Sequence, residues 1–130
     1  MLVELNGVTS QLALLALDAA SLRHQVIANN IANAQTEGYV AKYVSFENHL
    51  AGLMGKTHSV SEAEMQLQQI DQLKQQLLAG ELIESTGDEA VKLDSEMTKL
   101  AQNVIHYQSL LQALKGRGEI LRMAISEGRQ

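Results

Sequence analysis

Apolar residues recur at alternating intervals of three and four near the start of the chain. The series consists of Leu5, Val8, Leu12, Leu15, Ala19, Leu22 and Val26. This spacing predicts a helix that packs along a seam. Leu14 and Leu17 lie off the seam, so the helix is apolar on more than one side and needs several packing partners. We expect it to end near Ala32. Thr9 or Ser10 is a candidate N-cap, but the apolar series already starts at Leu5, which leaves the start open by several residues.

The last third of the chain repeats this pattern more regularly. Its series consists of Leu93, Met97, Leu100, Val104, Tyr107, Leu111, Leu114, Gly118, Leu121 and Ile125. A second long helix is therefore predicted, with Asp94 or Ser95 as its N-cap. Basic Lys115 and Arg117 lie toward its end, where positive charge complements the helix dipole.

The region between the two long helices follows other patterns. Residues 39–46 are rich in branched and aromatic side chains with partial alternation, which favours an extended segment or a short strand. Residues 47–54 return to helical spacing. Ser61 and Glu64 form a capping box, which predicts a helix over residues 61–79.

These elements give a mainly all-α fold in a single structural domain. Residues 1–34 form the N-terminal helix, residues 35–87 a central segment that is partly extended and partly helical, and residues 88–130 the C-terminal helix. A turn is expected at residues 84–88. Because two long apolar stripes lie at opposite ends of a short chain, we expect the terminal helices to pair as an antiparallel, coiled-coil-like hairpin.

Composition narrows the function classes. The 130 residues carry a formal net charge of −5 with no basic block, which argues against nucleic acid as a partner. Cysteine is absent, so neither a disulfide framework nor a thiolate metal site is available. The first residues lack the basic start of a secretory signal, and no stretch is apolar enough for membrane insertion.

No set of residues indicates catalysis, a cofactor or a metal. The histidines stand at His24, His49, His58 and His106. They show no HExxH spacing and no other familiar ligand pattern. The acidic residues form no pair on an apolar face that would act as general acid and base. We therefore expect a protein that is not an enzyme and that has no cofactor.

The apolar stripes instead predict an assembly surface. A two-helix hairpin would leave the second flank of each helix exposed, and a contiguous apolar surface of that kind indicates self-association or a partner. The predicted assembly seam consists of Leu12, Leu15, Leu22, Val26, Leu100, Val104, Tyr107, Leu111, Leu114 and Leu121. We expect the members from the two helices to pack with each other within and between subunits.

The end of the first helix contains three asparagines, at positions 29, 30 and 33. Asparagine is a mediocre helix former because its amide competes for nearby backbone groups. Thr36 and Gly38 follow, and they are typical of a chain that leaves a helix and turns. Spacing alone therefore favours a plain helix C-terminus.

This stretch also resembles the ANIANxxTPGY signature of the rod and hook axial proteins of the bacterial flagellum. The matching motif residues are Asn29, Asn30, Ile31, Ala32, Asn33, Thr36, Gly38 and Tyr39. Glu37 stands where proline is usual, which leaves the geometry of this turn open. Residues 91–97, together with Asn103 and Tyr107, are similar to the start of the last helix in the proximal-rod members.

The resemblance implies a structural proximal rod subunit of the basal body, which polymerises into the helical rod that transmits torque and surrounds the export channel. It implies export through the flagellar type III apparatus without a cleaved signal, and assembly in the periplasm. The implied partners are further copies of the chain, neighbouring rod proteins, the rod–MS-ring junction protein and the export gate. The alternative is a cytosolic helical adaptor or flagellar export chaperone.

Overall fold

The computed structural model describes residues 2–54 and 60–127. Their elements are, in order, α1 (Leu2–Ala32), β1 (Lys42–Val44), α2 (Phe46–Met54), α3 (Val60–Leu78), β2 (Ile83–Ser85) and α4 (Leu93–Glu127). The predicted mainly helical fold with long terminal helices is confirmed. His58 lies outside the described residues, as does the side chain of Leu121.

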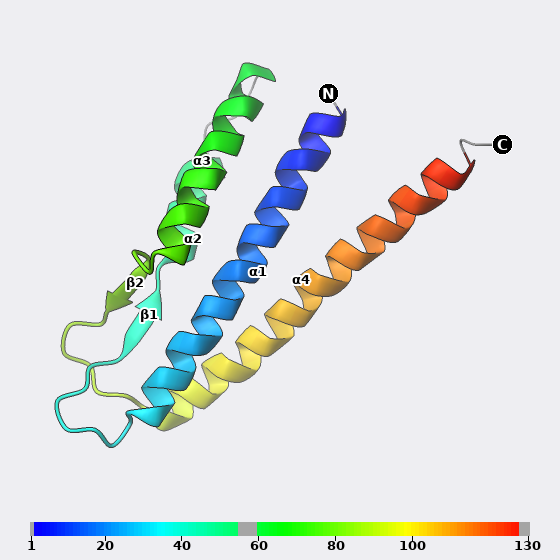
Figure 1. Ribbon diagram of the computed structural model, residues 1–130. Coiled ribbons are helices and arrows are strands. Elements are labelled where there is room, and N and C mark those ends of the chain that lie inside the picture. Colours follow the sequence, from blue (N-terminus) through cyan, green and yellow to red (C-terminus); the bar gives the residue numbers. More distant parts are fainter. Residues whose placement is uncertain (1, 55–59, 128–130) are drawn as a thin grey trace.

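Helix α1 occupies the centre of the arrangement (Figure 1). Helices α2 and α3 and the two strands lie along one side of it, and α4 lies along the other. Helix α4 runs antiparallel to α1, so that the two chain ends lie at the same end of the molecule. The pair is closest where α1 ends and α4 begins, and it spreads apart toward the termini (Figure 1).

The apolar core fills the space between α1 and the elements on its α3 side. Its buried members are Val8, Leu15, Ala19, Val26, Val44, Phe46, Ile70, Leu73, Leu77 and Leu82. Burial of each large side chain contributes roughly 1.5–3 kcal/mol. Among the described residues, α4 contributes no member to this cluster. The core therefore fixes α1 against α3, β1 and the start of α2.

The two strands form an antiparallel ladder that pairs Lys42 with Ser85 and Val44 with Ile83. The predicted extended segment over residues 39–46 thus contains a strand. The turn expected at residues 84–88 is displaced, because Ser85 still belongs to β2 and the chain bends only at Gly87 (φ 96°). Strand β2 was missed because it is held mainly by backbone hydrogen bonds and carries exposed polar side chains at positions 84 and 85.

The candidate N-cap residues of both long helices were wrong. Helix α1 begins at Leu2, so Thr9 and Ser10 lie inside it, and the apolar series indeed already starts at Leu5. In α4 the amide of Glu96 donates to the carbonyl of Lys92 (3.0 Å), which places Lys92 at the N-cap. The predicted cap residues instead lie in the first turn, where Asp94 complements the helix dipole. Helix α3 agrees with its prediction within a residue at each end.

Candidate functional site

The three asparagines at the end of α1 have different roles. The Nδ2 of Asn33 donates to the carbonyl of Asn29 (2.8 Å), and the hydroxyl of Thr36 donates to the Oδ1 of Asn33 (3.2 Å). These local contacts satisfy backbone and amide groups as the helix ends. Gly38 then adopts a φ of 79°, a left-handed conformation that favours glycine. The side chains of Asn33 and Thr36 therefore help to terminate the helix.

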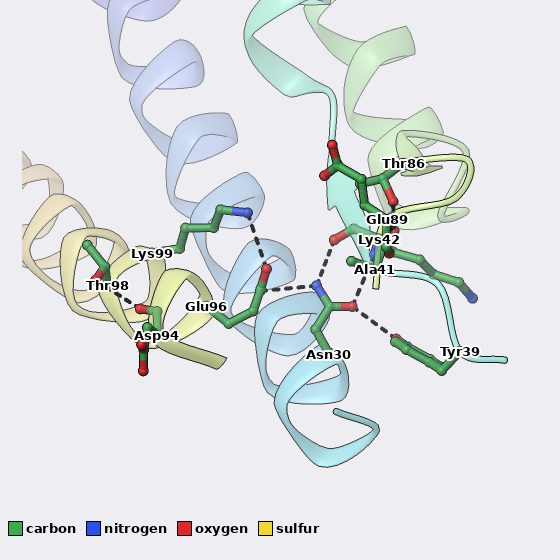
Figure 2. A network of polar contacts seen from close by, with 10 residues as sticks. All are labelled: Asn30, Tyr39, Ala41, Lys42, Thr86, Glu89, Asp94, Glu96, Thr98 and Lys99. Carbon is green, nitrogen blue, oxygen red and sulfur yellow. Dashed lines mark hydrogen bonds and ion pairs between the residues drawn. The ribbon is translucent and has the colours of Figure 1, made fainter. Parts of the chain in front are cut away.

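Asn30 is different because it is completely buried (0% exposed). Its Nδ2 donates to the carbonyl of Lys42 (2.8 Å) and to Oε2 of Glu96 (3.1 Å). Its Oδ1 accepts from the hydroxyl of Tyr39 (3.0 Å) and from the amide of Lys42 (3.1 Å). All four hydrogen-bonding positions of the amide are used. Figure 2 shows Asn30 between Glu96 on one side and Tyr39 on the other.

We call Asn30 with these partners the asparagine hub. It joins the end of α1 to the following loop, to β1 and to the first turn of α4. An unpaired polar group buried in this way would cost about 1–3 kcal/mol, and an unpaired charge would cost more. A fully paired amide avoids that cost and fixes the four segments in one arrangement.

Glu96 brings a buried carboxylate to the hub. Its side chain is only 4% exposed, and its Oε1 accepts from the half-exposed ammonium of Lys99 (3.2 Å). Glu96 also lies in the first turn of α4, where the helix dipole stabilises negative charge. The hydrogen bond from Asn30 completes its surroundings. This combination compensates for the loss of hydration of the carboxylate.

A second polar contact joins α1 to α4 farther along both helices. The Nδ2 of the buried Asn103 donates to the backbone carbonyl of Ala20 (2.8 Å). The small side chain at Ala20 lets α4 approach the backbone of α1. The Oδ1 of Asn103 is buried and has no partner in the described part of the chain. Asn103 therefore carries a desolvation cost of about 1–3 kcal/mol for that oxygen.

A cleft of about 450 Å³ lies between α1, β1 and α4, beside these two contacts. Val26 and Ile27 supply apolar wall, and Gln102 and His106 line the α4 side. At its edge, Arg23 of α1 forms an ion pair with Glu47 of α2 (2.6 Å).

The residues of the predicted seam lie in two different environments. Leu15 and Val26 are buried in the core, and Leu12 and Leu22 pack against it. Of the α4 members, Leu100, Leu111 and Leu114 are half-buried, and Val104 and Tyr107 are exposed. In the described structure, the α1 members thus pack in a cluster with α3. The α4 members do not belong to that cluster. Packing of the α4 members across a seam stays a prediction.

The apolar line along α4 is named here the α4 stripe. It consists of Leu93, Met97, Leu100, Val104, Tyr107 and Leu111. At about 100° per residue, Val104 lies roughly a quarter turn around the helix from Asn103. Met97 and Leu93 are about half exposed. Met97 and Val104 therefore lie beside the side of α4 that contacts α1, whereas the half-buried Leu100, four residues after Glu96, lies close to that side.

Other chemistry is sparse. The described residues contain no cluster of three or more histidine, aspartate or glutamate side chains able to hold a metal ion. Among the helices that the structure describes, none combines the length and apolarity needed to cross a membrane. The hydroxyl of Tyr43 donates to Glu84 (2.8 Å), and this hydrogen bond and the adjacent negative charge raise the pKa of Tyr43 above its ordinary value of 10.0. This contact links β1 to β2 at the surface.

Glu96, within residues 91–97, and Asn103 belong to the segments that resemble the proximal-rod proteins, but the sequence pattern did not predict a structural role for either residue. A signal for that role was present, because residues seven apart lie on the same side of a helix. The contribution of Lys42 to the hub has no such signal, since only its backbone amide and carbonyl take part.

Comparison with known proteins gives consistent results. Residues 11–39 match the family model described as "Flagella basal body rod protein", a segment that includes Asn30 and Tyr39. The chain is 32% identical over 116 residues to the "Flagellar basal body rod protein FlgB" of Bacillus subtilis (strain 168), covering 88% of this chain and 90% of that protein. The Escherichia coli (strain K12) protein of the same name is 30% identical over 112 residues, covering 78% of this chain and 81% of that protein.

Proposed function

The chain belongs to the FlgB family of flagellar basal body rod proteins, and we propose that α4 carries the surface through which it assembles into the rod. Members of this family are structural and are not enzymes. The chain is accordingly a structural component of the basal body rod. It assembles with other flagellar rod and basal-body components.

The exposure of the α4 stripe is the observation that carries the proposal. Met97 is 52% exposed and Val104 is 38% exposed, although both belong to a regular apolar pattern. Burying such a side chain against a neighbour is favourable by roughly 1.5–3 kcal/mol when burial is complete. Several of them in a line supply a large driving force for helix packing between subunits. Beyond Leu111, the half-buried seam member Leu114 continues the apolar series along α4.

The terminal helices form the inner layer of the rod around the export channel under this proposal. Residues 1–34 and 88–130 supply that layer, and residues 35–87 connect it to the outer part of the wall. The motif from Asn29 to Tyr39 holds the end of α1 at the junction between the inner layer and the outer part of the wall. Support comes from the hub, which joins this motif to both β1 and α4.

The proposal extends to the route and the neighbours of the subunit. The chain passes through the flagellar type III pathway without a cleaved signal and assembles in the periplasm. There it contacts further copies of itself, the next rod proteins, the rod–MS-ring junction protein and the export gate. The absence of cysteine supports this route, because such a chain stays unlinked as it moves from a reducing to an oxidising compartment.

Leu111→Asp tests the assembly surface. The charge should prevent burial of the seam, so we expect loss of swimming and of assembled rods with unchanged soluble expression. The measurements are a motility assay and imaging of purified basal bodies probed for this chain.

Gln112→Asp is the matched control, because residue 112 is the exposed neighbour of Leu111 on another side of α4. It should leave swimming intact. Normal swimming of Leu111→Asp would contradict the proposed seam. A wild-type chain that is absent from purified basal bodies and stays in the cytoplasm would instead favour the adaptor or chaperone function.

A further inference from the structure

Two hydrogen bonds that join the terminal helices involve residues of α4 that are seven positions apart. Glu96 accepts from Asn30, and Asn103 donates to the carbonyl of Ala20. Both α4 residues are more than nine-tenths buried. The side of α4 that meets α1 is thus marked by a buried carboxylate and a buried amide, although an apolar line of residues runs close by on the same helix.

The apolar face of α1 is already occupied. Leu15, Ala19 and Val26 are buried in the cluster with α3 and β1. A rotation of α4 by about a quarter turn would nevertheless bring its stripe toward α1, in place of Asn103. Such a rotation would reduce the exposed apolar surface of the isolated chain. The observed arrangement leaves Leu93, Met97 and Val104 exposed, so something in the chain must oppose the rotation.

Polar contacts can oppose it because they are specific to one arrangement. Apolar side chains tolerate sliding or rotation, since one methyl group replaces another as a neighbour. A buried hydrogen bond is lost when its partners separate, and this is the best-attested way in which buried polar residues fix helix register. Rotation of α4 would take Glu96 from Asn30 and Asn103 from Ala20 at the same time. The unpaired Oδ1 of Asn103 indicates that position 103 is not optimised for stability alone.

We infer that Asn30, Glu96 and Asn103 set the rotation and register of α4 on α1, and thereby hold the α4 stripe outward for a neighbouring copy of this chain. That the molecule covering the α4 stripe is another copy of this chain rests on the proposed function. The positioning role does not, because it concerns the isolated chain. These three are positioning residues, since they act through the orientation of the stripe.

The experiment measures the orientation of α4 in the full-length isolated chain. The chain has no cysteine, so spin labels attach selectively to two cysteines that are introduced by mutation. His24→Cys on α1 and Gln108→Cys on α4 are suitable, because both residues are exposed. The distance between the labels is compared in chains that carry Asn103→Leu, Glu96→Leu, both changes or neither.

We expect the double change to shift the mean label distance by several ångströms, up to the roughly 7 Å by which a quarter turn displaces the surface of a helix about 10 Å across. Binding of a dye that reports exposed apolar surface should fall as the stripe closes. Glu96→Gln is the matched control. Its amide oxygen can still accept from Asn30, so the distance and the dye signal should remain those of the unaltered chain.

An unchanged label distance in the double variant overturns the inference. If circular dichroism shows that the double variant is unfolded, Asn103→Leu decides, because the side chain of Asn103 donates to a single carbonyl of α1. An unchanged distance in that folded variant also overturns the inference. A shifted distance together with normal swimming would support the positioning role and contradict the proposed α4 assembly surface.

Discussion

Helices α1 and α4 share one sequence pattern and have opposite surroundings. Both alternate apolar residues at three and four positions, and both exceed 30 residues. Leu15 of α1 is 1% exposed, whereas Met97 of α4 is about half exposed. The α1 pattern is satisfied by α3 and β1 within the chain. Under our proposal, the α4 pattern is left for another molecule. A repeating apolar pattern therefore predicts that a helix has a partner, but not whether the partner belongs to the same chain.

The largest expected difference between the two helices is in core stability. Leu15→Ala should lower the free energy of unfolding by about 2–5 kcal/mol, because it leaves a cavity among fully buried side chains. Met97→Ala should change it by no more than about 0.5 kcal/mol, as for other surface positions. Urea denaturation followed by circular dichroism measures both. Equal losses would show that the α4 stripe is buried in the isolated chain.

A smaller loss is expected when the hub that joins the two helices is broken. Asn30→Ala removes the amide that donates to Lys42 and Glu96 and leaves these buried groups without that partner. We expect a loss of about 1–3 kcal/mol in the free energy of unfolding, measured in the same way. The control is Asn29→Ala, which makes the same truncation at the exposed adjacent residue. Equal effects of the two changes would rule out a special role for Asn30.

The ion pair that fastens α1 to α2 should contribute less. Glu47→Gln removes the pair with Arg23, and the carboxylate of Glu47 is mostly exposed. The expected loss is about 0.2–1 kcal/mol, and it should shrink further as salt is added. Urea midpoints at low and high ionic strength test this. A loss comparable to that of Leu15→Ala would mean that charge, rather than burial, fixes α1.

The smallest expected effect on stability concerns the pairing of β1 with β2, because β1 in turn packs against α1. The hydrogen bond from Tyr43 to Glu84 and the charge of Glu84 raise the pKa of Tyr43 in the folded state. The folded chain then retains this proton more strongly than the unfolded chain. The contribution is present below pH 10.0 and is lost as the pH rises through the folded-state pKa. Stability measured against pH should therefore fall less steeply above pH 10 in Tyr43→Phe, and identical curves would argue against the contact.

Much of the helical framework could be predicted from the sequence. The end of α1 near Ala32 and the span of α3 follow from local signals, namely asparagine-rich termination and a capping box. Strand β2 could not be predicted, because residues 83–85 are held by a partner strand about 40 positions earlier. The three asparagines of the motif look equivalent in sequence. Only Asn30 is buried, since its surroundings come from β1 and α4.

The hub also has a consequence for the order in which the chain folds. The partners of Asn30 lie 9 and 12 residues away at Tyr39 and Lys42, whereas Glu96 lies 66 residues away. Closing the longer loop costs about 1.5 kcal/mol more in chain entropy than closing the 12-residue one. We therefore expect the contacts of Asn30 with the loop and β1 to form early and the bond to Glu96 to form late. The C-terminal helix then docks onto a binding site that the first third of the chain has already built.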